Sequence, residues 1–343
     1  MDVKETLRRL CEAAGVAGEE TGARAEARRL LEPFGPCEET PLGSLLCTVR
    51  TGSRGAPRIM LDAHLDEIGL IVTAIDGDGF IQVSNCGGID RRLLPASAVT
   101  IHGREPVAAV VCTLPDGLAE DAGKKPGKIE SYTLDAGLCA ERARALIAPG
   151  DRVSADVPFR TLGGNWVCGK ALDNRAGCAA ILRAAQLLHE NGPDCTIVAA
   201  LTSMEEVGGM GAQTAAYQIA PTHAFVVDVS FGHCEGVPRY KTAALGSGPM
   251  IGMAPSLSLR MARELADCAG KNGIPFTFEV MGGRTGTNAD SIAATRGGVR
   301  TALLSIPERN MHTPVEVAAA ADVEAVARLI AAYICEWVGG AAS

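Results

Sequence analysis

Apolar runs and amphipathic segments alternate along the second half of the chain. Residues 173–190 (DNRAGCAAILRAAQLLHE) carry Ala, Ile and Leu at helical spacing, and the apolar run 195–201 (CTIVAAL) has the length of a buried strand. Residues 209–220 and 223–229 repeat this order of a helix followed by a strand. Such alternation is typical of a doubly wound α/β sheet, which we therefore expect here.

Residues 70–160 follow a different pattern. Short apolar runs such as FIQVSN, AVTIHG and PVAAVVCTL are separated by Gly, Pro, Asp and Asn at about 10-residue spacing, which is typical of a small all-β module. Helical spacing returns in residues 318–337, which we expect to close the chain as a helix. The simplest arrangement places residues 1–69 and 161–343 in one discontinuous α/β domain, with residues 70–160 inserted as a β-barrel-like domain.

Composition and charge narrow the class of protein. The formal charge of −8 argues against nucleic acids and anionic membranes as partners, because both require concentrated Lys and Arg. The N-terminal segment MDVKETLRRLCEAAG lacks the continuous apolar core of a secretory signal, and no uncharged apolar stretch reaches about 18 residues. The twelve cysteines contain no CxxC pair, which argues against a zinc ribbon. We expect a cytoplasmic protein.

Ionisable residues stand directly after several of the apolar runs. They are His64, Asp66, Asp173, Glu205, Glu206, Asp228 and His312. The carboxyl ends of the strands form the ligand crevice in open α/β sheets, so these side chains are expected to converge. Histidine and carboxylate ligands without cysteine suit two divalent metal ions that share a bridging carboxylate. In the Glu205–Glu206 pair, one carboxylate is expected to hold metal and its neighbour to act as a base.

Each of these residues also has a purely structural explanation when it is considered alone. His64 alone is more often a hydrogen-bonded core or surface histidine, and Asp173 alone could cap the helix that follows it. In HLD, however, a period of two places His64 and Asp66 on one side, and a carboxylate behind a metal-bound imidazole is a common arrangement. Loop or turn positions are the alternative for Glu205, Glu206, Asp228 and His312.

Seven segments resemble, in order, the dinuclear metallo-aminopeptidases of the tetrahedral, or TET, type, which include glutamyl and leucyl aminopeptidases. The segments are AHLDEIGLIV, GGID, ALDNRAG, MEEVGGMGA, VVDVS, ALGSGP and MHTPVE. This resemblance implies an enzyme that removes N-terminal residues from short peptides, with two divalent metal ions (Zn, Co or Mn) per subunit. It also implies a mixed-sheet α/β/α metallopeptidase domain with an inserted small β-barrel-like domain, and a homo-oligomer, commonly a dodecamer.

The same resemblance implies roles for individual residues. One metal ion is assigned to His64 and Asp228, and the other to Glu206 and His312, with Asp173 bridging both. Glu205 is assigned as the general base, and Asp66 as the residue that orients His64.

Two positions depart from the family pattern, and the role of a nearby arginine is open. Asn174 follows the bridging aspartate where the family often has Asp, and Asn288 stands in TNAD where the family often has TDA. The second departure lies in a glycine-rich loop expected to border the substrate pocket. Arg284 in that loop is a tentative substrate contact that would attract an acidic side chain, or an ordinary exposed arginine.

Three other functions stay open from the sequence. A related dinuclear amidohydrolase would act on N-acyl amino acids or on C-terminal residues with the same metal ligands. A glycoside hydrolase such as a glucanase would use two carboxylates and leave the histidines idle. A non-catalytic scaffold would only bind partners.

Overall fold

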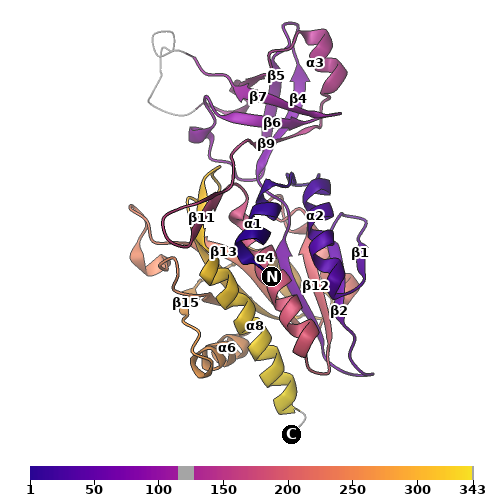
Figure 1. Cartoon of the computed structure of the whole chain (residues 1–343), viewed down its shortest axis with the longest axis vertical. Helices are drawn as coiled ribbons and strands as arrows, with labels where there is room; N and C mark the ends of the chain where they lie inside the picture. The colour runs from indigo at the N-terminus through magenta and orange to yellow at the C-terminus, as the bar shows by residue number, and fades with distance from the viewer. Residues whose placement is uncertain (115–126, 342–343) are drawn as a thin grey trace.

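The computed structural model describes residues 1–114 and 127–341, and these residues form two sheets (Figure 1). The larger sheet is mixed. Its strands in spatial order are β1 (Cys37–Glu39), β2 (Leu45–Arg50), β12 (Thr196–Thr202), β3 (Arg58–His64), β13 (His223–Phe231), β16 (Arg300–Arg309), β17 (Glu316–Ala319), β11 (Trp166–Gly169) and β10 (Arg160–Thr161), with β14 (Met250–Met253) beside β16 and β15 (Thr277–Val280) beside β14. The predicted α/β class with a mixed sheet is confirmed.

Four neighbouring strands at the centre of this sheet, β12, β3, β13 and β16, run parallel. Thr202 pairs with His64 across β12 and β3, and Asp228 pairs with Ser305 across β13 and β16. Their carboxyl ends therefore lie at the same edge of the sheet, as the alternation of strands and helices predicts.

Helices cover both faces of the large sheet. One apolar core holds residues from α1 (Val3–Glu12), α2 (Thr21–Leu31), α4 (Leu172–Asn191), α6 (Leu259–Lys271) and α8 (Ala320–Ala341). A second, smaller core lies under α5 (Met210–Ile219) and α7 (Asn288–Ala293). Short 3-10 turns are η1 (Glu32–Phe34), η2 (Arg91–Leu93), η4 (Ile129–Ser131) and η5 (Arg239–Lys241). The result is the expected α/β/α layering.

The closing helix begins later than its periodicity predicts. Residues Glu316–Ala319 form β17, which pairs with β11 and β16, and α8 starts only at Ala320. A run of alanines fits a helix or a buried strand, so sheet pairing decides its conformation here.

The second sheet is a closed barrel that stands at one end of the large sheet (Figure 1). Its strands in order are β4 (Gly69–Ile75), β5 (Ile81–Cys86), β8 (Thr133–Asp135), β7 (Pro106–Val111), β6 (Ala98–His102) and β9 (Arg152–Ala155), and α3 (Ala140–Leu146) belongs to the same segment. The barrel encloses its own apolar core. On this basis we propose that residues 70–160 form a domain separate from residues 1–69 and 161–343; residues 115–126 of the predicted insert lie outside the described residues.

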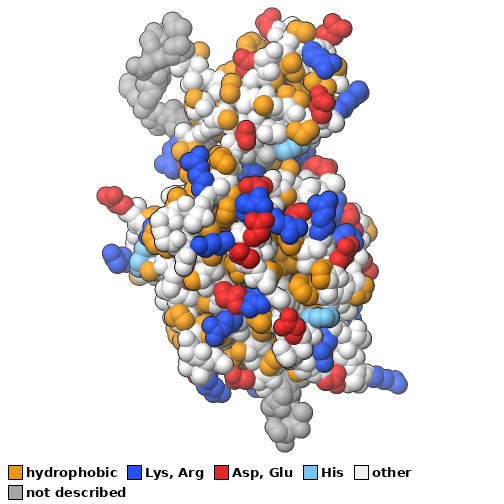
Figure 2. All heavy atoms as spheres, viewed as in Figure 1, with side chains coloured by type: hydrophobic (Ala, Val, Ile, Leu, Met, Phe, Trp, Pro, Cys, Tyr) orange, Lys and Arg blue, Asp and Glu red, His pale blue; other side chains and the backbone are white. Residues whose placement is uncertain are grey.

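The visible surface carries both signs of charge. On the face drawn in Figure 2, Lys and Arg side chains are interspersed with Asp and Glu rather than gathered into a basic patch. This face therefore offers no concentrated cation surface for a polyanion. Within the described residues, no helix is both long and apolar enough to span a membrane.

Candidate metal centre and substrate cleft

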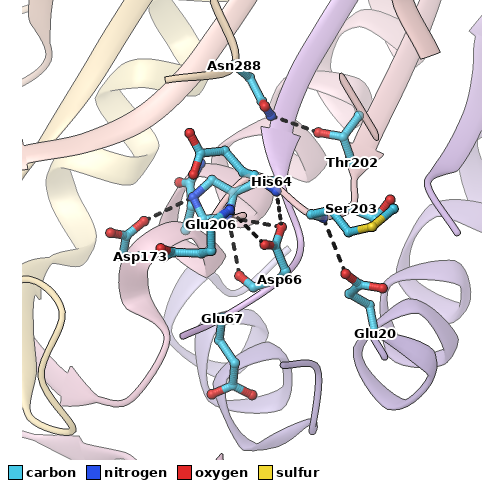
Figure 3. A network of polar contacts seen from close by, with 12 residues as sticks. Glu20, His64, Asp66, Glu67, Asp173, Thr202, Ser203, Glu206 and Asn288 are labelled. Atoms are coloured by element: carbon cyan, nitrogen blue, oxygen red, sulfur yellow. Dashed lines mark hydrogen bonds and ion pairs between the residues drawn. The ribbon is translucent and has the colours of Figure 1, made fainter. Parts of the chain in front are cut away.

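His64 lies at the end of β3, between carboxylates from two other elements. Its Nε2 atom is 3.0 Å from Oδ1 of Asp173 at the start of α4 and 3.7 Å from Oδ1 of Asp228 on β13. These three buried residues place one candidate ligand atom each within 4.8 Å of one another. Figure 3 shows His64 turned toward Asp173 on one side and Asp66 on the other.

A second group of candidate ligands shares Asp173 with the first. Nε2 of His312 is 3.3 Å from Oδ2 of Asp173 and 3.7 Å from Oε2 of Glu206. The two carboxylate oxygens of Asp173 thus face two different imidazoles. The structure brings all five predicted ligands together in two groups with one common member.

The charges in this cluster favour bound cations. Burial raises the pKa of Glu206 to about 8 and that of Asp228 well above its usual value, with the Asp173 carboxylate adding to both shifts. Burial would also raise the pKa of Asp173, but the hydrogen bonds from His312 and His64 lower it. Crowded, buried carboxylates are stabilised in their ionised form by an adjacent positive charge. The donor set of imidazole nitrogens and carboxylate oxygens therefore fits divalent metal ions.

Asp173 does not cap α4, which was the structural alternative for it. Among the described residues, Ala171 stands at the N-cap position of this helix without a side-chain hydrogen bond, and Asp173 and Asn174 have non-helical dihedral angles in the first turn. Nδ2 of Asn174 donates to the Val227 carbonyl at 2.8 Å, and its Oδ1 accepts from the Gly177 amide at 3.0 Å. Asn174 thereby connects the segment that carries Asp173 to β13 at Val227, the residue before Asp228.

Glu316 fixes the backbones of two candidate ligands at once. Its Oε2 accepts from the Asp173 amide at 3.1 Å, and its Oε1 accepts from the His312 amide at 3.0 Å. The imidazole of His312 is held from the other side, because its Nδ1 is 3.0 Å from the carbonyl of Gly88, which follows the barrel strand β5. The position of His312 thus depends on a residue beside the barrel as well as on the large sheet.

Asp66 contacts more than His64. Its backbone oxygen lies 3.2 Å from Nδ1 of His64 and its Oδ1 lies 3.5 Å away, consistent with the predicted orienting role. Its carboxylate also accepts hydrogen bonds of 3.0 Å from the amides of Glu205 and Glu206. Asp66 therefore sets the position of the loop that carries both glutamates. The side chains of Glu205 and Glu206 are half-buried rather than part of a solvated loop, and burial raises the pKa of Glu205.

Asn288 is buried beneath the cleft and does not line it. Its Nδ2 donates to Thr202 Oγ1 at 2.9 Å (Figure 3). The same Nδ2 donates to Asp62 Oδ2 at 3.1 Å. Burial raises the pKa of the Asp62 carboxyl to about 7. The loop before Asn288 does border the cleft, as predicted, but the Asn288 side chain supports the strand ends.

The candidate ligands open onto a cleft of about 680 Å³. Glu205 lines it, together with loop residues 284–287 and the strand residues Ser230 and Ser305. Arg284 stands at the rim with its side chain 89% exposed, and its Nε is 3.9 Å from Oδ2 of Asp290. Pockets of this volume accommodate small ligands such as short peptides.

Sequence reasoning missed several residues that shape the site. Glu316 and Gly88 lie inside the segments MHTPVE and GGID that resemble the family, and this was the only sign in the sequence that they belong to the site. Asn174 was noted only as a departure from the family. Glu279 also lines the cleft and had no signal, because it follows the short run PFTF in an otherwise unremarked segment.

Comparison with known proteins gives consistent matches over the whole chain. The family model described as M42 glutamyl aminopeptidase matches residues 43–329. A lysyl aminopeptidase of Pyrococcus furiosus is 31% identical, over 97% of this chain and 96% of its own. An aminopeptidase structure from the archaeon Desulfurococcus kamchatkensis has a TM-score of 0.90 and 29% identity, covering 98% and 97% of the two chains. The TET1 peptidase of Pyrococcus horikoshii, described as assembling into a tetrahedron or a large octahedral shell, has a TM-score of 0.87 and 30% identity, covering 98% and 100%.

Proposed function

The chain belongs to the M42 aminopeptidase family, and from this premise we propose that it is a metal-dependent aminopeptidase that removes N-terminal residues from short peptides. The peptidase activity follows from the family. The dependence on two metal ions and the roles of single residues are our proposal, and one observation carries them. Two groups of candidate ligands share Asp173 and open onto a cleft that Glu205 also lines.

The proposed ligands divide between the two groups. His64 and Asp228 would hold one ion, Glu206 and His312 would hold the other, and Asp173 would contribute an oxygen to each. Two divalent ions held there, with Zn the first choice and Co or Mn as alternatives, would lower the pKa of a water and polarise the scissile carbonyl.

Glu205 is the proposed general base. Its carboxylate receives the proton of the attacking water and later delivers it to the amine that leaves. Burial raises the pKa of Glu205, which moves it toward the range in which a carboxylate both accepts and returns a proton near neutral pH. Asp66 positions Glu205 through the hydrogen bond to its amide, and it faces His64 from behind.

Partners and location complete the proposal. Short peptides are the substrates, with Arg284 as a tentative contact at the rim of the cleft. The TET1 peptidase forms large shells, and we propose that this chain likewise forms a homo-oligomer, with a dodecamer as the specific expectation. The cytoplasmic location and the absence of nucleic-acid and membrane partners stay predictions.

A hydrolysis screen tests the function. The protein is stripped with EDTA, and each of Zn, Co and Mn is added back before aminoacyl and N-acetyl-aminoacyl chromogenic substrates are supplied. We expect activity on free-amine substrates that is lost on chelation and restored by metal. Preference for N-acetylated substrates would favour a deacylase, chelator-resistant activity on glucans would favour a glycosidase, and no hydrolysis with any metal would favour a scaffold.

A further inference from the structure

Glu279 is a carboxylate of the cleft that belongs to neither group of candidate ligands and has no role in the proposed mechanism. Glu279 lies on β15, and its Oε2 accepts a hydrogen bond of 2.7 Å from the hydroxyl of Ser305. Its Oε1 accepts a second hydrogen bond from the hydroxyl of Ser230. Glu279 lines the same cleft as His64 and Asp173. The two hydroxyl donors hold the carboxylate of Glu279 in one place in the cleft.

The two serines place this charge relative to the metal ligands. Ser305 is the register partner of Asp228 on the adjacent strand β16. Ser230 follows Asp228 by two residues on β13, so it faces the same side and lies about 7 Å further along the strand. A carboxylate bonded to both hydroxyls therefore lies beside the strand position that carries Asp228.

The other charged residues on this side of the cleft do not cancel the negative charge of Glu279. Asp290 is a second carboxylate that lines the cleft, and it accepts hydrogen bonds from the amides of Thr285 and Gly286. Arg284 is the one cation among the described lining residues, apart from the histidines; its side chain is 89% exposed and is directed toward Asp290. The cleft beside the metal centre is thus negatively charged, and its arginine stands at the rim.

We propose that Glu279 binds the cationic side chain of an N-terminal lysine or arginine, and that the enzyme therefore prefers peptides with a basic first residue. This inference rests on the proposed aminopeptidase function. With the scissile carbonyl at the metal centre, the four-carbon stem of a lysine would extend its ammonium group into the cleft that Glu279 also lines. A neutral side chain would desolvate the carboxylate without replacing its water, so it would be discriminated against.

The first test uses the unmodified, metal-reconstituted enzyme. Lysyl and norleucyl chromogenic substrates have the same aliphatic stem and differ at its end, where only lysine carries an ammonium group. We expect kcat/KM for the lysyl substrate to exceed that for the norleucyl substrate by roughly tenfold or more, the typical value of a hydrogen bond to a charged group. Equal values for the pair, or a glutamyl substrate that outpaces both, would overturn the inference.

The second test removes the charge with Glu279→Gln. We expect kcat/KM for the lysyl substrate to fall roughly 10- to 100-fold, while that for the norleucyl substrate changes by less than about threefold. Glu235→Gln is the matched control, because Glu235 is exposed and lies outside the residues that line the cleft, and it should alter neither value.

The outcomes separate this inference from the function on which it rests. An equal loss on both substrates in Glu279→Gln would mean that Glu279 holds the α-amine common to all substrates, and the inference would be wrong while the aminopeptidase proposal stands. Failure of the reconstituted wild type on every aminoacyl substrate would instead remove the proposed function itself. The comparison of lysyl with norleucyl substrate needs no variant, so a misfolded Glu279→Gln leaves the inference testable.

Discussion

At the scale of single residues, the two adjacent glutamates have separate tasks that mutation can distinguish. Glu206 lies 3.7 Å from His312 and belongs to a group of candidate ligands, whereas Glu205 lines the cleft without belonging to either group. We predict that Glu205→Gln retains two metal ions per subunit and loses about 10²–10⁴ in kcat, because only the proton acceptor is removed. Elemental analysis and steady-state kinetics on the same preparation measure both quantities.

Two neighbouring changes serve as controls for that prediction. Glu206→Gln should lose metal from one site, and Asp173→Ala should lose metal from both, because Asp173 offers an oxygen to each group. Normal turnover by Glu205→Gln would show that the proton goes elsewhere, and full metal occupancy in Asp173→Ala would contradict a bridge.

Residue types at strand ends allowed the candidate ligands to be predicted, while the groups that support them could not be. His64, Asp173 and Asp228 carry chemistry that stands out against apolar neighbours. Asn174 and Glu316 act through backbone amides and carbonyls, and any polar residue is a candidate for such contacts until the chain is folded. Glu279 reaches the cleft only because β15 is added to the sheet beside β14, a pairing that its sequence does not specify.

At the scale of elements, the start of α4 depends on the absence of one side chain. A Cβ added at Gly177 would lie 2.1 Å from Oδ1 of Asn174 and 2.9 Å from the Val227 carbonyl. We predict that Gly177→Ala destabilises the metal-free protein by about 1–3 kcal/mol, as overpacking does in buried sites. The added Cβ would push Asn174 aside and displace the adjacent Asp173, so metal affinity should fall as well. Urea denaturation and metal titration provide the two measurements.

A second glycine gives the matched control. Gly270 lies in α6, and a Cβ added there meets no atom within 4 Å. Gly270→Ala should therefore leave metal binding unchanged and stabilise the protein by up to about 1 kcal/mol, the usual gain for alanine in a helix. A Gly177→Ala protein that behaves like Gly270→Ala would refute the close contact.

The first turn of α8 anchors the glycine-rich loop before β14. Asp322 is 1% exposed, and its carboxylate accepts hydrogen bonds of 2.7 Å from the amides of Gly246 and Gly248. Burial raises the pKa of Asp322 to about 6 from its ordinary value of 3.8, although these two amides oppose the shift. The folded state thus binds more protons than the unfolded state between these values, and stability decreases as pH rises through this window.

We predict that Asp322→Asn removes this pH dependence. The wild type should lose about 1 kcal/mol of unfolding free energy between pH 5 and pH 7 that the variant does not lose. Urea midpoints of the metal-free proteins at both pH values give the comparison, with the exposed Asp267→Asn on α6 as the control. A difference between wild type and Asp322→Asn that is the same at both pH values would be inconsistent with the raised pKa.

The elements with a clear apolar periodicity could be predicted together with their boundaries, and the end of the chain could not. The expected helix over 173–190 and strand over 195–201 appear as α4 and β12 within one residue at each end. Both elements are buried against the same apolar core, and their pattern of apolar residues can be read from a short stretch of sequence. The end of the chain was misjudged at Ala318 and Ala319, because pairing with a strand distant in sequence determines their conformation.

At the scale of the whole molecule, an exposed sheet edge supports assembly. Phe278 and Val280 on β15 are 47% and 77% exposed, and β15 pairs with β14 alone among the described strands. Apolar side chains on an unpaired edge are commonly covered in an oligomer. We predict that sedimentation equilibrium gives a mass several times that of the 35.5 kDa chain. A monomer at micromolar concentration would count against the proposed oligomer.

The inserted barrel carries a consequence for any attempt to reduce this enzyme to a minimal form. Gly87 and Gly88 pass so close to Glu206 and His312 that a Cβ on either glycine would come within 3.2 Å of those side chains. The Gly88 carbonyl is also the acceptor that His312 faces. A truncated chain that joins β3 directly to β11 would retain every proposed ligand and yet leave one imidazole free to rotate. Any replacement module would have to present a backbone oxygen at the same point, so we predict that the proposed chemistry requires the insert.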